Sequence, residues 1–395
     1  MAQLLDGIRV LDLTRWLAGP VSSMCLGDMG AEVIKIEAPK KGDDSRHVGP
    51  DVNGESGYFL SVNRNKKSLV INLKSRKGKE IIQELTKEAD VVMENFTPGT
   101  MDKFGLDYAT LKAINPKIVY ASCSGFGQTG PYAKKPAYDA IMQGYGGIMS
   151  VTGTADSGPT RVGVSIADLT SGYYLTIGIL AALFNREHTG QGQQLEVSLL
   201  DCQVAMLENP VMRYFASGAT PGPAGNRHPS ITPYGAFPTK DGQVIIAVGN
   251  DKQWQAFCKA ANREQLSRDG RFATNTLRTE NYDALEPIIN GILQQEATAR
   301  WIEILEAANV PCGPINTVQD IANDPQVKHR EMIMSLSHPS AGEVMVAANP
   351  LKFSDTPISS TAPPPLLGEH SEEILTGVLG YGKMALGELE EDGVI

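Results

Sequence analysis

The chain has 395 residues, of which 42% are hydrophobic and 20% charged, and its formal net charge is −10. The length allows two or three domains, and the composition excludes a disordered chain, which would combine low hydrophobicity with high charge. The acidic balance argues against a nucleic-acid-binding protein, which usually carries a basic surface. The five cysteines are scattered without a Cys-x-x-Cys pair. They therefore predict neither a disulfide framework nor a zinc site, and they suit a reducing compartment such as the cytoplasm.

Strand and helix patterns alternate along the first half of the chain, which argues for a parallel sheet built from βαβ units. Helices are expected to open at Ala18-Gly19-Pro20 and to cover Ser75–Glu88, Leu106–Ile114 and Leu169–Asn185. The expected strands are Ile8–Leu13, Glu32–Ile36, Ser68–Leu73, Val91–Glu94, Ile118–Ser122 and Gln194–Ser198.

The second half begins with a Gly/Pro-rich stretch, Gly218–Gly225, which is typical of a linker or loop. Val244–Asn309 then holds one strand pattern and several amphipathic helix patterns, which predict a second, smaller domain. The most apolar stretch, Leu169–Phe184, is shorter than the roughly 20 residues that cross a bilayer, so we expect a buried helix and no membrane span. The N-terminus shows no secretion signal. The histidines form no ligand spacing, so no metal site is expected.

The segment Gly125–Gly130 reads Gly-x-Gly-x-x-Gly directly after a predicted strand. A dinucleotide site requires a helix to continue from the last glycine of this motif. Pro136 would interrupt the early turns of such a helix. A structural turn is therefore favoured over a nicotinamide or flavin site.

A cationic run crosses the predicted third strand and the helix after it. It indicates either a solvated helix face or an anion site that also uses the N-terminus of the Ser75 helix, and the sequence leaves both open. Its members are Arg64, Lys66, Lys67, Lys74, Arg76, Lys77 and Lys79.

Asp168 directly precedes the apolar helix pattern. A helix N-terminus favours the ionised form of a carboxyl group, so we expect it to favour an ionised Asp168. The apolar neighbours Ile166, Ala167 and Leu169 would limit hydration and so raise nucleophilicity. Asp168 is therefore either a helix cap or a nucleophile.

Ordered motifs cover almost the whole chain. They are Leu5–Pro20, Gly27–Glu37, Gly42–Arg46, Asn63–Ser68, Glu94–Gly99, Ser124–Pro131, Thr189–Gln193, Cys312–Ile315 and Pro365–His370. Together they resemble the class III CoA-transferase family, of the formyl-CoA transferase and carnitine CoA-transferase type. Asn63–Ser68 and the ending Pro363–His370 look most like members that serve small dicarboxylic acids, of the succinyl-CoA:glutarate and oxalate types.

The resemblance implies that Asp168 is the nucleophile, forming a mixed anhydride with the acyl group and then an aspartyl-CoA thioester. Coenzyme A or acyl-CoA would be a substrate, with no covalently bound cofactor. The resemblance implies that CoA is bound by Leu17, Ala18, Asn72, Leu73, Lys74, Asn95, Phe96, Lys103 and Tyr138.

The departures from the formyl-CoA enzyme concern its phosphate and acceptor contacts. Ala38 stands in place of an arginine and Pro136 in place of a lysine, so part of the phosphate clamp differs. Leu17 stands in place of a glutamine. The arginine fork suits a carboxylate, and we expect the Gly225–Pro229 loop to bind the distal carboxylate of a dicarboxylic acceptor. The candidate side chains are Arg46, Arg161, Asn226, Arg227 and His228.

The fold implied is α/β: a Rossmann-like large domain plus a smaller α/β domain, in ring-shaped subunits that interlock as a homodimer. The expected division is a large domain over residues 1–215, a small domain over 216–325, and a return to the large domain with a C-terminal tail over 326–395. Two other functions stay open. An α-methylacyl-CoA racemase would use a histidine where Tyr138 stands, and a tyrosine with a pKa near 10 suits proton abstraction poorly. A non-catalytic CoA-binding protein would have no need of Asp168.

Overall fold

The computed structural model describes residues 3–358 and 362–395. The chain divides into two compact units, the larger formed by Met1–Met149, Arg161–Ala219 and Gln326–Ile395, and the smaller by Ser150–Thr160 and Thr220–Pro325. The sequence places residues 150–160 in the large domain, and that boundary is wrong. The backbone N–H of Gly225 donates to the carbonyl of Gly153 over 2.7 Å, which ties this segment to the smaller unit.

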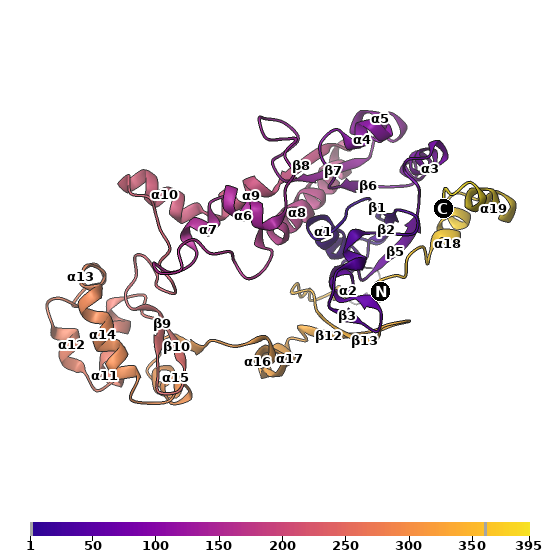
Figure 1. Ribbon diagram of the computed structural model, residues 1–395. Coiled ribbons are helices and arrows are strands. Elements are labelled where there is room, and N and C mark those ends of the chain that lie inside the picture. Colours follow the sequence, from indigo (N-terminus) through magenta and orange to yellow (C-terminus); the bar gives the residue numbers. More distant parts are fainter. Residues whose placement is uncertain (1–2, 359–361) are drawn as a thin grey trace. The chain divides into compact units, whose positions relative to one another are not determined.

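The larger unit is built on a six-stranded sheet in which every neighbouring pair is parallel (Figure 1). In chain order, the first three strands lead from the centre of the sheet to one edge, and the last three lead from the centre to the other edge. This is the doubly wound order of a Rossmann-like fold. This confirms the predicted α/β class with a parallel central sheet. Across the sheet the strands are β5 (Lys66–Val70), β2 (Glu32–Glu37), β1 (Arg9–Asp12), β6 (Val91–Glu94), β7 (Val119–Ser124) and β8 (Gln194–Ser198).

Both faces of this sheet are buried, because alternate residues of each strand enter different cores. On β1, Leu11 packs in one core with Ile81, whereas Val10 packs in the other with Leu175. The first face is covered by α3 (Arg76–Thr86), α5 (Tyr108–Ile114), α18 (Ser371–Gly377) and α19 (Lys383–Glu391). The second is covered by α1 (Ala18–Asp28), α6 (Asp139–Tyr145), α8 (Ile166–Thr189) and α9 (Leu199–Met206).

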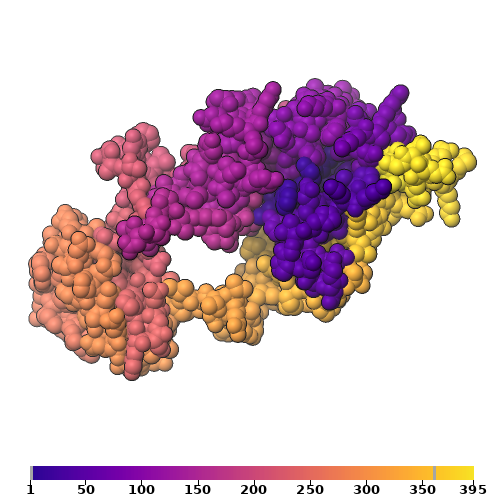
Figure 2. Space-filling view, viewed as in Figure 1, coloured from indigo at the N-terminus to yellow at the C-terminus, as the bar shows by residue number. Residues whose placement is uncertain are grey.

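Helix α8 has the length and apolarity of a membrane span, with 24 residues. One side of it is nevertheless in the core, where Ala167, Leu175 and Ile179 are fully buried, as the sequence predicts for this stretch. It begins three residues before the predicted start, which places Asp168 in its first turn rather than ahead of it. Helix α10 (Glu208–Ser217) has no buried residue and stands out from the surface of its unit (Figure 2).

The sequence patterns missed a hairpin in the returning segment, β12 (Ile333–His338) with β13 (Gly342–Ala347). Leu336 and Val344 of this hairpin pack on Leu60, almost 300 residues earlier in the chain, so the contact has no local signal. The shorter elements of this unit are η1 (Asp44–His47), β3 (Asp51–Val52), β4 (Glu55–Ser56), α2 (Gly57–Val62), α4 (Thr100–Phe104) and α7 (Ile148–Val151, shared with the smaller unit).

The smaller unit has a three-stranded antiparallel sheet and its own core around Trp254 and Phe257. Arg278 is fully buried in it, donating to the carbonyls of Thr232 and Phe272, which compensates for the loss of water. The strands are β9 (Tyr234–Pro238), β10 (Gln243–Ala247) and β11 (Cys312–Pro314). The helices are α11 (Asp251–Ala260), α12 (Glu264–Arg268), α13 (Asn275–Glu280), α14 (Tyr282–Leu293), α15 (Thr298–Ala307) and α16 (Val318–Asn323), and α17 (Pro325–His329) follows at the return to the larger unit.

Candidate active site

The site begins with the turn between β1 and α1, at the carboxyl end of the central strand. Asp12, the last residue of β1, is fully buried and accepts hydrogen bonds from the backbone N–H of Thr14 at 2.9 Å and from Ser23 Oγ. Burial opposes its ionisation, but Lys66, Lys35 and the hydroxyl donors outweigh burial and lower the pKa of Asp12 to about 2. The turn therefore rests on a permanently ionised carboxylate.

Polar contacts fix the turn on both sides. Trp16 has a φ of +67°, in the left-handed region that bulky residues seldom adopt, and its N–H donates to Asp43 Oδ1 at 3.2 Å. Lys35 bridges this pair to the turn, because its Nζ lies 2.8 Å from Asp43 Oδ2 and donates to the Thr14 carbonyl. On the other side, Asn95 accepts from Arg15 N at 2.8 Å and donates to Arg15 O at 2.7 Å.

Helix α6 holds the start of α8 through Asp139. Asp139 Oδ1 accepts from the backbone N–H of Ala167 at 2.9 Å, and Oδ2 accepts from Gln143 Nε2 at 2.8 Å. Asp139 therefore satisfies one of the unpaired N–H groups of the α8 N-terminus from outside the helix. The neighbouring residue, Asp168, is left to face the cavity beside it.

The carboxyl group of Asp168 is unusual in its charge state. Burial, and after it the negative charge of Asp139, raise the pKa of Asp168 to about 7, and neither a cation nor a hydrogen bond offsets them. Burial and Asp139 therefore act on the charge state of Asp168 in the direction opposite to that expected from the helix N-terminus. A desolvated carboxylate with a raised pKa is a stronger nucleophile than a solvated one, because it lacks the hydrogen bonds that stabilise its charge.

A cavity of about 330 Å³ contains Asp168. Trp16 and Tyr138 form one part of its wall, with their rings edge to face and their centroids 6.2 Å apart. Burial and the nearby Asp168 raise the pKa of Tyr58 to about 12, so its hydroxyl stays a hydrogen-bond donor. The other lining residues are Ala18, Asn95, Cys123, Ser124, Gly125, Ala137, Asp139, Ala140, Arg161, Ser165 and Leu199.

A second cavity, of about 290 Å³, lies at the carboxyl ends of β2, β5 and β6. Arg15 and Lys74 are its only cations among the described residues. Arg15 also lies over the Phe96 ring, 5.1 Å from its centroid. Because Arg15 lines this cavity and Trp16 lines the Asp168 cavity, one turn borders both. An elongated ligand with an anionic end fits such a pair of cavities.

The structure brings most of the candidate CoA residues to these two cavities. Ala18, Asn95 and Tyr138 lie with Asp168, and Asn72, Leu73, Lys74 and Phe96 line the second cavity. Two candidates line neither. Leu17 is buried against Val21 and Val62, and Lys103 is exposed on α4 between two residues that do line the second cavity, Thr100 and Phe104.

One expectation about a cationic side chain is wrong, and one of the two alternatives left open for the cationic run is excluded. Arg46 is not available to an acceptor acid, because its guanidinium binds both oxygens of Glu37, at 2.8 and 2.7 Å. The cationic run does not form one anion site. Arg64 is paired with Asp28 at 2.6 Å, Lys66 is buried beside Asp12, and the side chain of Arg76 is 94% exposed.

The loop candidates Asn226, Arg227 and His228 belong to the smaller unit, whereas Asp168 belongs to the larger. Arg227 stacks over the Tyr282 ring at 3.5 Å, and His228 stacks on Tyr234 with centroids 5.1 Å apart. None of the three is among the lining residues of the Asp168 cavity. The Gly125–Gly130 segment is a turn, as expected, and no helix begins until α6.

Sequence reasoning missed Trp16, Tyr58 and Asp139. A left-handed backbone at a tryptophan has no sequence signature, and Tyr58 reaches the site from α2, far from Asp168 in sequence. Asp139 had a usable signal. It is a carboxylate directly after Tyr138, in the first turn of α6, and a carboxylate is a favourable partner for the N-terminus of a helix.

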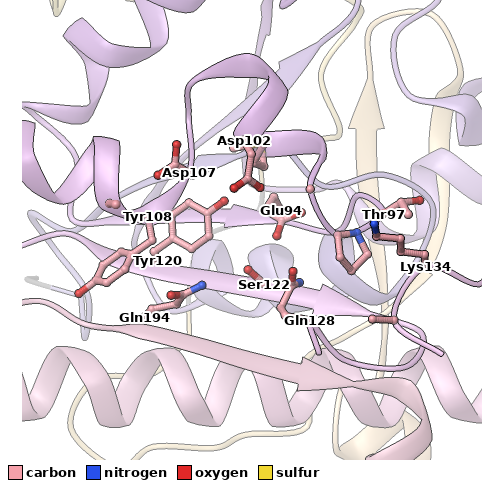
Figure 3. Close-up of a pocket in the computed structure, with 15 residues that line it drawn as sticks. Glu94, Thr97, Asp102, Asp107, Tyr108, Tyr120, Ser122, Gln128, Lys134 and Gln194 are labelled. Atoms are coloured by element: carbon pink, nitrogen blue, oxygen red, sulfur yellow. The ribbon is translucent and has the colours of Figure 1, made fainter. Parts of the chain in front are cut away.

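A third cavity, of about 480 Å³, lies around Glu94, with Asp102, Ser122 and Tyr120 around it in Figure 3. Glu94 is 4% exposed, and burial raises its pKa to about 7. Its Oε2 accepts from the N–H of Phe96 at 2.8 Å, so it supports the turn that carries Asn95. Three carboxylates and one ammonium, Lys134, make this cavity unsuited to phosphates. Among the described residues no cluster of His, Cys, Asp and Glu could hold a metal ion.

The chain belongs to CoA-transferase family III, whose model matches residues 5–371. It is an enzyme that transfers CoA. It is 43% identical over 392 residues to mouse succinyl-CoA:glutarate CoA-transferase, covering 99% of this chain and 90% of the relative. Over 350 residues it is 43% identical to acetyl-CoA:oxalate CoA-transferase of Acetobacter aceti, covering 88% of this chain and 89% of the relative.

Solved structures agree with this assignment. A CAIB/BAIF family protein from Brucella suis superposes with a TM-score of 0.86 at 42% identity, covering 95% of this chain and 100% of that one. Rv3272 from M. tuberculosis superposes with a TM-score of 0.85 at 31% identity, covering 94% of this chain and 98% of that one.

Proposed function

We propose that this enzyme moves CoA from a short acyl-CoA such as succinyl-CoA to a small dicarboxylic acid, with Asp168 as nucleophile. The proposal is carried by one observation on two neighbouring cavities. The first contains Asp168, a desolvated carboxylate without a cation partner, and the second contains two cations. The β1–α1 turn lines both cavities. The names of the relatives, which act on succinyl-CoA with glutarate and on acetyl-CoA with oxalate, support the substrate class.

The reaction has two half-reactions. Asp168 attacks the thioester carbonyl, the C–S bond breaks, and a mixed anhydride and the CoA thiolate result. The thiolate then attacks the aspartyl carbonyl, which releases the donor acid and leaves an aspartyl-CoA thioester. The acceptor carboxylate attacks that thioester to form a second mixed anhydride, and the thiolate attacks its acyl carbonyl. Acceptor acyl-CoA leaves and Asp168 is regenerated, so no activated bond is lost to water.

The second cavity takes the nucleotide end of CoA in this proposal. Lys74 and Arg15 supply the positive charge for phosphates, and Phe96 and Phe104 supply aromatic walls for the adenine. Asn95, which clamps Arg15, and Tyr138 border the thioester end. Ala38 also lines this cavity and offers no charge, so Lys74 and Arg15 form the phosphate clamp of this chain.

We further propose that the enzyme is an interlocked homodimer of ring-like subunits that works in the cytoplasm. The apolar side chains that α8 and α10 expose in a single chain, including Tyr173, Phe184 and Phe215, support a large subunit interface. The five free cysteines support a reducing compartment.

The nucleophile is tested by Asp168→Ala, because removing the attacking group should lower CoA transfer at least about a thousand-fold. Incubation of the unmodified enzyme with acyl-CoA and hydroxylamine should convert the Asp168 side chain to a hydroxamate, detected by peptide mass spectrometry. The matched control is Asp201→Ala, an exposed aspartate in the first turn of α9, which should keep full activity. Label on another carboxylate, or turnover by Asp168→Ala, would refute the assignment.

A further inference from the structure

We infer that Arg161 binds the distal carboxylate of the acceptor acid, and this inference rests on the proposed transferase function. Among the described residues that line the Asp168 cavity, Arg161 is the only cation, and the other two charged residues, Asp139 and Asp168, are carboxylates. A dicarboxylic acid that presents one carboxylate to Asp168 must desolvate the other, which is costly without a partner of opposite charge. Arg161 supplies that charge in a planar fork that fits a carboxylate.

The position of Arg161 is fixed by its neighbour in the chain. The N–H of Val162 donates to Gln143 Oε1 at 2.9 Å, and Gln143 is fully buried. Gln143 Nε2 donates to Asp139, which in turn accepts from Ala167 N at the start of α8. Through these bonds both ends of the segment from Arg161 to Asp168 are anchored to α6. The backbone that carries Arg161 and the backbone that carries Asp168 are therefore held in a set relation before substrate arrives, which limits the entropy lost on binding.

The guanidinium of Arg161 remains available. Its side chain is 44% exposed, and its contacts to Asp139 Oδ2 and Ser165 Oγ are both 3.5 Å long. Asp139 does not depend on Arg161, because both of its oxygens already accept shorter hydrogen bonds. Arg46 shows the opposite arrangement: its side chain is 9% exposed and bound to Glu37 through two hydrogen bonds. An arginine whose backbone is held in place but whose guanidinium is weakly paired can bind a ligand. An arginine whose guanidinium is fully paired stabilises the fold instead.

This assignment replaces the Gly225–Pro229 loop, the sequence-based choice. Arg161 lines the cavity of the nucleophile itself, whereas Arg227 is stacked on Tyr282 within the smaller unit.

The test compares glutarate with pentanoate, which has the same chain length but a methyl group in place of the second carboxylate. The acceptor acid reacts only in the second half-reaction, so its kcat/KM does not depend on how the donor binds. Succinyl-CoA can therefore serve as donor throughout. Arg161→Gln should lower kcat/KM for glutarate about 10- to 100-fold and that for pentanoate less than about threefold, the range of a hydrogen bond to a charged group. Arg161→Lys should recover part of the glutarate rate, since it restores the charge without the fork.

Arg76→Gln is the matched control, because Arg76 is a solvent-exposed arginine of the same unit and lines none of the cavities described above. It should leave both acceptors unchanged. A glutarate-to-pentanoate ratio that Arg161→Gln leaves unaltered, or an equal fall for both acids, would overturn the role of Arg161 while the transferase function stands. If the unmodified enzyme transfers CoA to neither acid, the proposed function fails and this inference fails with it.

Discussion

Asp12 and Asp168 are two carboxylates of one unit whose surroundings move their pKa values in opposite directions. Asp12 lies among two lysines and several hydroxyl donors, so burial is outweighed and its pKa falls to about 2. Asp168 is also buried, but the charge that acts on it is the negative charge of Asp139, and its pKa rises to about 7. The first carboxylate is fixed as an anion and stabilises a turn. The second keeps its reactivity because nothing neutralises it.

The raised pKa predicts the pH dependence of the enzyme. Only the ionised form of Asp168 attacks a thioester, so kcat/KM for acyl-CoA should rise with pH and level off above about pH 7. Because Asp139 contributes to the raised pKa, Asp139→Asn should move the midpoint to lower pH. The profile is measured from pH 5 to 9 with saturating acceptor. A profile that is already level at pH 5 would contradict the charge environment described for Asp168.

At this scale the sequence singled out Asp168, which faces a cavity in the structure, but it misjudged Arg46 and left the cationic run undecided. The partners of Arg46 and Arg64 are Glu37 and Asp28, and nothing in the sequence marks these pairs. Whether a charged side chain is paired depends on the three-dimensional neighbours of its strand, so a linear run of cations carries little information on a binding site.

Between elements, the site depends on how closely α1 approaches α8. Gly172 lies one turn after Asp168, and a Cβ atom there would stand 2.6 Å from the carbonyl oxygen of Ala18 and 3.3 Å from the Val21 side chain. These distances show that the two helices touch through backbone at the point where both border the Asp168 cavity. Because Gly172 has no side chain, α8 can lie this close to α1. This close contact sets the separation of Asp168 from the β1–α1 turn.

Gly172→Ala should therefore push α8 away from α1, lowering both the melting temperature and kcat. The added methyl group meets backbone that cannot move aside cheaply, and overpacking of this kind costs about 1–3 kcal/mol. Melting temperature and kcat are measured on the same preparation. The matched control is Gly387→Ala in α19, where no atom lies within 4 Å of the new Cβ. It should be neutral or stabilising, since alanine favours a helix over glycine. Equal melting temperatures for the two variants would contradict the close contact.

The elements of the large unit could be predicted well because their pattern is local. Five of the six parallel strands lie within one or two residues of their predicted bounds, since buried strands read as short apolar runs between turn residues, whereas β5 begins two residues and ends three residues before its predicted range. The β12–β13 hairpin and the left-handed Trp16 could not be predicted, because the first depends on packing against α2 and the second on Asp43.

At the scale of the whole molecule, the two units have separate cores. The larger unit has one core on each face of the parallel sheet, and the smaller unit has one core around Trp254. The start of the smaller unit was misplaced because Ser150–Thr160 is joined to it by backbone contacts that cross about 70 residues. Within the larger unit, the outer side of α8 and all of α10 expose large apolar side chains, with Phe215 at 77%. A surface of this kind indicates an interface.

The interlocked dimer proposed above predicts unusual exchange behaviour. If two closed subunits thread each other, one cannot leave without unfolding, so dilution should not release monomers. Tagged and untagged dimers are mixed and the tagged chains are captured at intervals. Untagged chains should be absent from the capture until the mixture is unfolded and refolded. Mixed dimers that form within hours under native conditions would contradict interlocking, and a monomeric mass by light scattering would contradict the dimer itself.

The charged residues beneath the β1–α1 turn also restrict how this enzyme can evolve or be redesigned. Replacing Asp12 alone would strand the buried ammonium of Lys66, and replacing Lys35 alone would strand Asp43, so either single step passes through an unstable protein. The part of the cavity wall formed by the side chains of Tyr58 and Tyr138 is under no such restriction, since neither side chain belongs to a buried ion pair. New acyl specificities should therefore arise by changes in the wall, over a turn that stays the same.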